Sequence, residues 1–292
     1  MILFFAFYLF LLTSNNLIES FIFNKLINRF NNKINFDKKL KNNNKNNNKY
    51  LVLNKQNKFY DSNNITNFIE ENLNNNVTIS ISPGGVKGFY LMGTCCFIKE
   101  NYDLNKYIFT GASAGSWNSL LMTYKGELQN IIDLIHKVDY DNIKSLYELQ
   151  LNLKNIILNN FNNDDFDLNK LFIGVTVFTK FKFKTYIYSD FDNLEDAIDC
   201  CIASSHIPFI TGKFLYKYKN KYSFDGGFSN NPYFDYIKKA IHITPDIWKK
   251  LVVNNNLEDD SFYLDKVKFI KLYFDGYDDA KNNNHIIKEL IK

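Results

Sequence analysis

Three short stretches of this 292-residue chain combine small residues with side chains suited to nucleophilic chemistry. The first is Gly111-Ala112-Ser113-Ala114-Gly115, a Gly-x-Ser-x-Gly pattern that follows an aromatic and β-branched run at residues 107–110. A strand that ends in this pattern and continues into a helix is the context of a nucleophile elbow, where a serine hydroxyl is held up on a very tight turn. Because the positions two residues from that serine must lack side chains, Gly111 and Gly115 fit the prediction that Ser113 is a nucleophile.

The second stretch, Pro83-Gly84-Gly85-Val86-Lys87-Gly88, follows a predicted strand at residues 77–81 and precedes helical spacing at residues 89–100. A glycine loop between a strand and a helix start aims backbone N–H groups at an anion. A Walker phosphate loop is excluded because Gly-Lys-Ser/Thr is missing, and a dinucleotide site fits poorly because no acidic residue follows at the expected distance. Since the serine pattern lies on the next strand, we predict an oxyanion hole made by Gly84, Gly85, Val86, Lys87 and Gly88.

The third stretch is Asp225-Gly226-Gly227, which ends a hairpin predicted over residues 214–224 with its turn at Asn220-Lys221. An Asp-Gly pair by itself usually marks only a turn. The distribution of glycine changes that interpretation, because seven of the twelve glycines in the chain fall in the three stretches. Residues that permit unusual backbone are therefore concentrated where a serine and a reactive carboxylate would need them.

The elements that must hold these loops alternate between strand and helix, which predicts an α/β domain. The middle of the chain adds two amphipathic helices, at residues 127–140 and 145–159. Their apolar faces are typical of a core, and in a lipid enzyme they could also form a cap over the pocket. An antiparallel strand pair is predicted at residues 171–179 and 181–188.

A helix over residues 194–204, with Asn193 or Asp192 as its cap, leads into a run of small residues at positions 203–209. That run has two interpretations. It is either a tight packing corner between a helix and a loop, or a wall of an acyl pocket near Ser113.

Charge is unevenly distributed along the chain. Residues 1–60 hold ten Lys and Arg against two acidic residues, a net of +8, and the whole chain carries +4, so residues 61–292 carry −4. The basic excess therefore belongs to a leader and not to the folded body, which argues against nucleic acid as a partner. Hydrophobic residues make up 46% of the chain, which is enough for a sizeable core.

An unbroken apolar run at residues 2–12 has the length of a signal-peptide core and is short for a membrane-spanning helix. We expect residues 1–20 to be a signal peptide or signal anchor, and residues 21–60 to be a basic, Asn/Lys-rich disordered leader. The expected localisation is entry into the secretory or endomembrane system, or membrane association, with the organelle left open.

The rest of the chain carries weaker signals. Its four cysteines form the adjacent pairs Cys95-Cys96 and Cys200-Cys201 in helical stretches, where neighbours point about 100° apart, so small core residues are the expected role. Past Pro245 the sequence predicts a strand at residues 267–274 and a helix at residues 279–291. No metal site, cofactor motif or repeat is found, and no obligate protein partner is inferred.

Together and in this order, the motifs resemble the patatin-like phospholipase family. The resemblance spans roughly residues 77–235 of a domain expected over residues 77–292, and it also uses Ala203-Ser204-Ser205-His206-Ile207-Pro208 and Asn230-Asn231-Pro232. It implies a three-layer α/β/α patatin-like sandwich with a central, mostly parallel sheet. It also implies hydrolysis of lipid acyl esters by a Ser-Asp dyad without histidine, with Ser113 as nucleophile and Asp225 as proton acceptor.

Two residues depart from the pattern of that family. Pro83 stands where the glycine loop usually opens with another Gly, which removes one backbone N–H and fixes the entry angle of the loop. Lys87 replaces the usual Arg, which keeps the charge but loses the planar fork of the guanidinium. Both departures bear on the geometry of the donors in the loop, and neither moves Gly84 or Gly85.

The predicted function is that of a lipid acyl hydrolase, a phospholipase A-type esterase that acts on a glycerolipid or phospholipid at a membrane surface. An aspartate is ordinarily a weak base, so the dyad requires close contact and a partly desolvated site. One alternative is an α/β-hydrolase esterase with a Ser-Asp-His triad, for which only His242 and His285 follow Asp225 in the chain. Another alternative is a catalytically inactive lipid-binding module that keeps the fold.

Overall fold

The computed structural model of the chain describes residues 50–53, 77–138, 143, 145–179, 182–228, 240–248 and 266–291. The chain divides into two compact units, Met1–Asn47 and Asn48–Lys292, and all described residues belong to the second. The predicted signal peptide and most of the predicted leader lie outside the described residues. Inside the predicted leader, the structure describes one strand, β1 (Tyr50–Leu53). The boundaries of the leader and of the domain at residues 77–292 stay a prediction.

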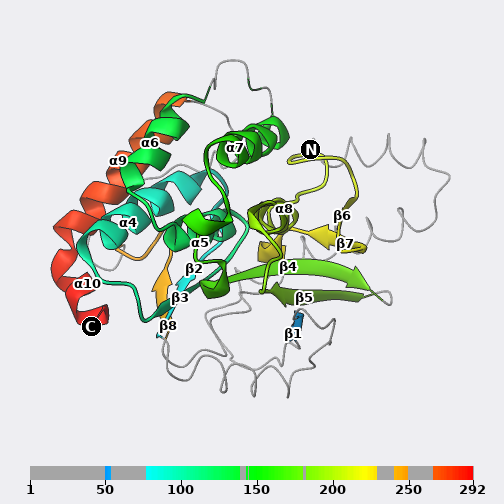
Figure 1. Ribbon diagram of the computed structural model, residues 1–292, viewed down its shortest axis with the longest axis horizontal. Coiled ribbons are helices and arrows are strands. Elements are labelled where there is room, and N and C mark those ends of the chain that lie inside the picture. The colour runs from blue at the N-terminus through cyan, green and yellow to red at the C-terminus, as the bar shows by residue number, and fades with distance from the viewer. Residues whose placement is uncertain are drawn as a thin grey trace, which may run out of the picture. The chain divides into compact units, whose positions relative to one another are not determined.

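A mixed sheet of mostly parallel strands forms the centre of the second unit and is flanked by helices (Figure 1). Its described strands follow the order β1-β5-β4-β3-β2-β8, with β7 paired to β4 and β6 paired to β7. The strands are β2 (Val77–Ile81), β3 (Tyr107–Ala112), β4 (Leu171–Thr179), β5 (Lys182–Tyr188), β6 (Tyr216–Tyr218), β7 (Lys221–Phe224) and β8 (Ala240–Ile243). The fold is the expected three-layer α/β/α class.

The strands that carry the predicted loops lie next to one another and run parallel. β2 pairs with β3 on one side and with β8 on the other, and β3 pairs with β4. Helix α4 (Gly88–Asn101) connects β2 to β3, as a parallel pair requires. The carboxyl ends of β2 and β3 therefore open at the same edge of the sheet, so the loop after each strand emerges beside the other.

The predicted antiparallel pair is confirmed as β4 and β5. The predicted hairpin is confirmed as β6 and β7, but its turn lies at Lys219 and Asn220, one residue earlier than expected. Both turn residues have positive φ, at 44° and 60°, which matches the twist of the flanking strands in a two-residue hairpin.

Helices α5 (Ala114–Thr123) and α8 (Leu194–Ser204) pack on β3 and β4. α5 begins at Ala114, directly after Ser113. The predicted cap of α8 is Asn193, whose side-chain oxygen accepts a hydrogen bond from the backbone N–H of Asp196 at 2.8 Å. That bond satisfies one of the free N–H groups at the start of the helix.

Two further helices, α6 (Leu128–His136) and α7 (Leu146–Asn160), follow α5 along the chain (Figure 1). The first ends four residues before the predicted helix end. Lys154 ties α7 to α8, since its Nζ lies 2.6 Å from Asp199 and 2.9 Å from Glu195. α7 is therefore fixed on the layer of helices that covers β4.

The prediction of a strand at residues 267–274 is wrong. These residues belong to a long helix, α9 (Lys266–Asn282), which is followed by α10 (Asn284–Leu290). Buried positions at Phe269, Leu272, Gly276 and Ala280 recur every three or four residues, and this face packs along α4. The aromatic and aliphatic residues of this stretch suit either structure, and the partner helix decides between them.

All four cysteines are buried and free, in α4 and α8, as expected for small core residues. Burial raises the pKa of the Cys201 thiol to about 12, so this group stays protonated and unreactive at neutral pH. Within the part of the chain that the structure describes, no helix has both the length and the apolar character needed to cross a bilayer.

Candidate active site

Ser113 occupies the junction between β3 and α5 in an unusual backbone conformation, with φ 55° and ψ −129°. Positive φ is uncommon and strained for a residue with a side chain, and such strain gathers at functional sites. Ser116 holds the turn in place, because its backbone N–H and its Oγ both donate to the Ser113 carbonyl oxygen, at 2.9 Å and 2.6 Å. Ser113 is buried, with 6% of its surface exposed.

The two glycines of the Gly-x-Ser-x-Gly pattern are required by backbone contacts. A Cβ at Gly111 would lie 2.2 Å from the carbonyl oxygen of Gly115. A Cβ at Gly115 would lie 2.2 Å from the carbonyl oxygen of Ile81, at the end of β2. The turn therefore folds back on itself and against the neighbouring strand, which leaves no room for a side chain at either position.

Asp225 meets Ser113 although 112 positions separate them. The Ser113 hydroxyl donates to Asp225 Oδ2 at 2.5 Å, and the other carboxylate oxygen, Oδ1, accepts from the backbone N–H of Gly227 at 2.7 Å. The backbone N–H of Asp225 donates to the carbonyl oxygen of His206 at 2.7 Å. The carboxylate is thus buried, oriented by a backbone amide and aimed at the serine hydroxyl.

The sheet explains why the two residues meet. Asp225 directly follows β7, which pairs antiparallel with β4, and β4 is the neighbour of β3. A Cβ at Gly226 would lie 2.2 Å from the carbonyl oxygen of Gly174 in β4 and 2.7 Å from the Cβ of Ala112 in β3. The Asp-Gly-Gly loop therefore lies directly on the strand that delivers Ser113.

Ser204, at the end of α8, makes a contact with Ser113 that the sequence did not predict. Its Oγ accepts from the backbone N–H of Ser113 at 2.8 Å and donates to the carbonyl oxygen of Gly174 at 2.6 Å. It therefore ties the strained turn to β4. The signal available in the sequence is the run of small residues at positions 203–209, which belongs to the motifs of the resemblance but does not by itself indicate a hydrogen bond to Ser113.

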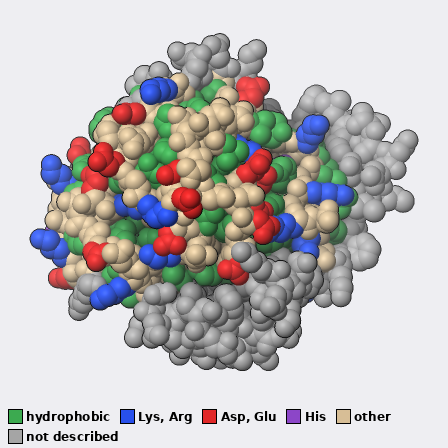
Figure 2. Space-filling model, in the orientation of Figure 1, with side chains coloured by type: hydrophobic (Ala, Val, Ile, Leu, Met, Phe, Trp, Pro, Cys, Tyr) green, Lys and Arg blue, Asp and Glu red, His purple; other side chains and the backbone are tan. Residues whose placement is uncertain are grey.

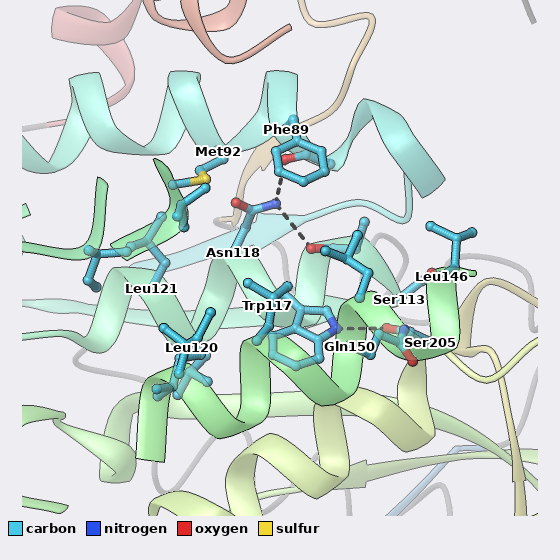
Figure 3. A pocket seen from close by; sticks show the side chains of 18 of the residues that line it. Phe89, Met92, Ser113, Trp117, Asn118, Leu120, Leu121, Leu146, Gln150 and Ser205 are labelled. Carbon is cyan, nitrogen blue, oxygen red and sulfur yellow. Dashed lines mark hydrogen bonds between the residues drawn. The ribbon is translucent and has the colours of Figure 1, made fainter. Parts of the chain in front are cut away.

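The glycine loop lies on the other side of Ser113. It forms a short 3-10 turn, η1 (Gly85–Lys87), with Gly85 at φ 54°. Asn118 of α5 holds its end, because Nδ2 donates to the carbonyl oxygens of Gly88 at 3.0 Å and Ala114 at 3.1 Å (Figure 3). The first N–H groups of a helical turn have no partner within the turn and are available to an anion.

The five predicted loop residues differ in their access to the site. Gly85, Val86 and Gly88 line the same pocket as Ser113, whereas Gly84 and Lys87 are not among its lining residues. The Gly84 carbonyl oxygen instead accepts from the backbone N–H of Lys87 at 3.0 Å and closes the turn. Three of the five predicted residues, Gly85, Val86 and Gly88, therefore border the cavity that holds Ser113.

An apolar cavity of about 200 Å³ opens beside Ser113 (Figure 3). Most of its wall consists of Leu, Ile, Phe and Met side chains from α4, α5, α6 and α7. The run at residues 203–209 contributes Ser205 and Ile207, as its interpretation as a pocket wall predicted, and Thr211 beyond it also lines the cavity. Ser205 Oγ accepts from the indole N–H of Trp117 at 3.1 Å, which ties this wall to α5.

His206 takes part through its backbone and not through its ring. The ring is 1% exposed and packs against Tyr216 and Phe224, with Nε2 3.4 Å from the carbonyl oxygen of Phe214. Burial lowers the pKa of His206 to about 4, so the ring is neutral at neutral pH. Its carbonyl oxygen, as described above, holds the Asp225 backbone.

The two histidines of the triad alternative lie elsewhere. His242 is on β8, paired with Ser80 of β2, and Ser80 in turn pairs with Thr110 of β3. It is therefore two strands away from β3, about 10 Å across the sheet, and three residues before the level of Ser113. His285 is exposed on α10. Neither position favours a Ser-Asp-His arrangement around Ser113.

Among the described residues, no group of three or more His, Cys, Asp or Glu side chains is placed to hold a metal ion.

On the face of the molecule drawn in Figure 2, acidic and basic side chains are interspersed over the described surface. The arrangement of Ser113, Asp225 and the loop amides supports nucleophilic chemistry that uses the chain's own groups.

Comparison with known families decides the relationship. The family model of patatin-like phospholipase matches residues 79–237, which is more than half of the chain and includes all three loops. The chain belongs to the patatin-like phospholipase family. None of the curated proteins compared with the chain is similar enough to count as a match. Membership of the patatin-like phospholipases assigns the chain to the lipid acyl hydrolases, and the mixed α/β/α sheet is the fold expected for them.

Proposed function

We propose that the chain is a phospholipase A-type esterase that cleaves acyl esters of glycerolipids with Ser113 as nucleophile and Asp225 as proton acceptor. The observation that carries this proposal is the 2.5 Å hydrogen bond from Ser113 Oγ to Asp225 Oδ2, formed at the head of an apolar cavity. A nucleophile paired with an oriented base is the signature of covalent catalysis.

In the proposed reaction, Ser113 Oγ attacks the ester carbonyl carbon while its proton passes to Asp225 Oδ2. The tetrahedral intermediate then expels the alcohol, which takes that proton, and leaves an acyl-enzyme. Water attacks the acyl-enzyme by the same proton route and releases the fatty acid. The amide of Gly227, bonded to Oδ1, keeps the carboxylate pointed at the hydroxyl throughout.

The oxyanion is proposed to bind amides of the loop at residues 84–88, chiefly those of Gly85 and Val86, which line the cavity beside Ser113. Such donors act on charge that develops only in the transition state, and each is worth roughly 3–4 kcal/mol in other enzymes. The N-terminus of α5 begins at Ala114 and adds a favourable field for negative charge at this position.

The acyl chain is proposed to occupy the apolar cavity, with the head group directed to solvent at a membrane surface. We further propose that residues 1–20 carry the chain into the secretory or endomembrane system or attach it to a membrane. The localisation of a fluorescent fusion, compared with and without residues 1–20, tests this proposal.

The experiment compares wild type with Ser113→Ala and Asp225→Asn on phospholipid, galactolipid and triacylglycerol panels. Both variants are expected to lose at least about a thousandfold in kcat/KM, because each removes one half of the proton transfer. Asp278→Asn, an exposed substitution of the same kind on α9, serves as the matched control. A fluorophosphonate probe should label wild type at Ser113 and leave Ser113→Ala unlabelled.

Full turnover in Asp225→Asn together with a dead Ser113→Ala would show that the dyad is wrong. Loss of turnover in His242→Ala or His285→Ala would favour the triad. A folded wild type that neither reacts with the probe nor cleaves any ester would favour the inactive lipid-binding module.

A further inference from the structure

One polar side chain in the pocket wall, that of Gln150, has an oxygen atom that accepts no hydrogen bond in the described structure. Among the described residues, the polar side chains of the wall other than Gln150 make hydrogen bonds to protein groups: Ser113, Asn118, Ser205 and Thr211. Gln150 is 8% exposed, and its Oε1 is buried without a hydrogen-bond partner in the described structure. It is the exception in a wall that is otherwise apolar or internally satisfied.

The helix that carries Gln150 holds it toward the cavity. Lys154 lies one turn further along α7 and is bound to Asp199 and Glu195 of α8, so this face of α7 is fixed against α8. Gln150 lines the same cavity as Ser113 and Ser205, and Figure 3 draws these three residues on the side of the view away from Met92 and Leu121. Gln150 is therefore part of the wall of the cavity that also holds Ser113.

An unpaired buried acceptor is costly, and only a hydrogen-bond donor relieves the cost. The ester and phosphodiester groups of a diacyl lipid have no donor. A free hydroxyl has one. The chemistry that satisfies Oε1 is therefore a hydroxyl close to the scissile ester.

We infer that Gln150 is a specificity-determining residue that selects lipid esters with a free hydroxyl near the scissile ester over esters without one. The inference rests on the proposed function, because it assumes that the ester binds at Ser113. The hydroxyl has two sources of the same chemistry: the glycerol of a lipid with one acyl chain, or the acyl chain itself close to its carboxyl end.

Two matched substrate pairs separate the sources. The first is 1-decanoyl lysophosphatidylcholine against its 2-O-methyl ether, which differ only in the glycerol hydroxyl. The second is methyl 3-hydroxydecanoate against methyl decanoate, which differ only in the acyl hydroxyl. The ratio of kcat/KM within each pair is measured for wild type, Gln150→Met and Gln129→Met. Gln129 is exposed on α6 outside the pocket and gives the same substitution as a control.

Wild type is expected to prefer the hydroxyl member of one pair by roughly tenfold, the usual value of one hydrogen bond to an otherwise unpaired buried group. Gln150→Met should bring that ratio close to one, and Gln129→Met should keep it. A wild-type ratio near one in both pairs, or a ratio unchanged by Gln150→Met, would overturn the inference.

A second measurement keeps this test separate from the proposed function. Binding of the same four lipids to Ser113→Ala, with and without Gln150→Met, is measured at equilibrium and needs no turnover. If wild type cleaves no ester, the proposed function fails, yet tighter binding of a hydroxyl lipid that depends on Gln150 would still support the inference. Equal binding of both members of each pair would overturn it.

Discussion

The two halves of the site are built in different ways. Around Ser113, positions are fixed mainly by contacts to the backbone: glycines without room for a Cβ, the Gly227 amide on the carboxylate, and the bridge from Ser204 Oγ to β4. The apolar cavity is built largely from side chains of four helices that meet only in the folded chain. The first half therefore depends on close backbone contacts, and the second depends on the volume enclosed by apolar side chains.

This difference predicts how each half responds to change. The close backbone contacts around Ser113 leave no room for relaxation, so a substitution there is expected to lower the stability of the whole fold or the rate of the whole reaction. An apolar wall adjusts to small changes of volume, so a substitution there changes which lipid fits. Three experiments test this contrast, in order of decreasing expected effect.

The largest effect is expected from Gly115→Ala. Its Cβ would lie 2.2 Å from the Ile81 carbonyl oxygen, so β2 and the serine turn would have to separate. We expect a loss of at least about 3 kcal/mol in the free energy of unfolding, measured by urea denaturation. Gly84→Ala is the comparison, because the nearest atom to its Cβ would be the end of the Leu91 side chain at 3.2 Å and the nearest backbone atom would be Gly88 N at 3.4 Å, with an expected loss under about 1 kcal/mol. Equal losses in the two variants would contradict the account of the elbow.

A second, smaller effect is expected from pH through His206. Its pKa is lowered to about 4 by burial, whereas an exposed histidine titrates near pH 6.5. As the pH falls from about 6.5 to 4, the unfolded chain takes up a proton that the folded chain refuses, so stability falls by at most roughly 3 kcal/mol.

The check is the slope of unfolding free energy against pH in wild type and His206→Phe. The variant lacks the titrating group, so its curve should be flatter over this window, while His285→Gln, an exposed control, should follow wild type. Parallel curves for wild type and His206→Phe would show that burial of this ring does not set the acid stability.

The smallest effect is expected in the cavity. Leu153→Phe adds volume to the wall two turns along α7 from Leu146, so long acyl chains should lose several-fold in kcat/KM relative to short ones. Leu151→Phe places the same change on the exposed side of α7, where Leu151 is 37% exposed, and should leave the chain-length profile as it is. A matching shift in both variants would mean that the cavity does not bind the acyl chain.

Local patterns predicted most of the elements. The strand at residues 77–81 was placed at its observed bounds, and the cap at Asn193 and the β4–β5 pair were anticipated, because each depends on near neighbours. The predicted strand at residues 267–274 failed for the opposite reason. Its run of aromatic and aliphatic residues becomes helical through contact with α4, for example where Phe269 stacks on Phe89 at 4.5 Å between ring centroids.

The sequence by itself determined where the three glycine-containing loops lie, because a tight turn, a glycine loop and an Asp-Gly-Gly corner each need particular residue types within a few positions. Only the tertiary structure decided that Ser113 and Asp225 meet, since their distance depends on the order of β3, β4 and β7 across the sheet. It also decided the Ser204 bridge and the unpaired Oε1 of Gln150. Both features depend on how helices from distant parts of the chain pack together. The pattern of residue types along the sequence does not show which polar groups find a partner in that packing and which do not.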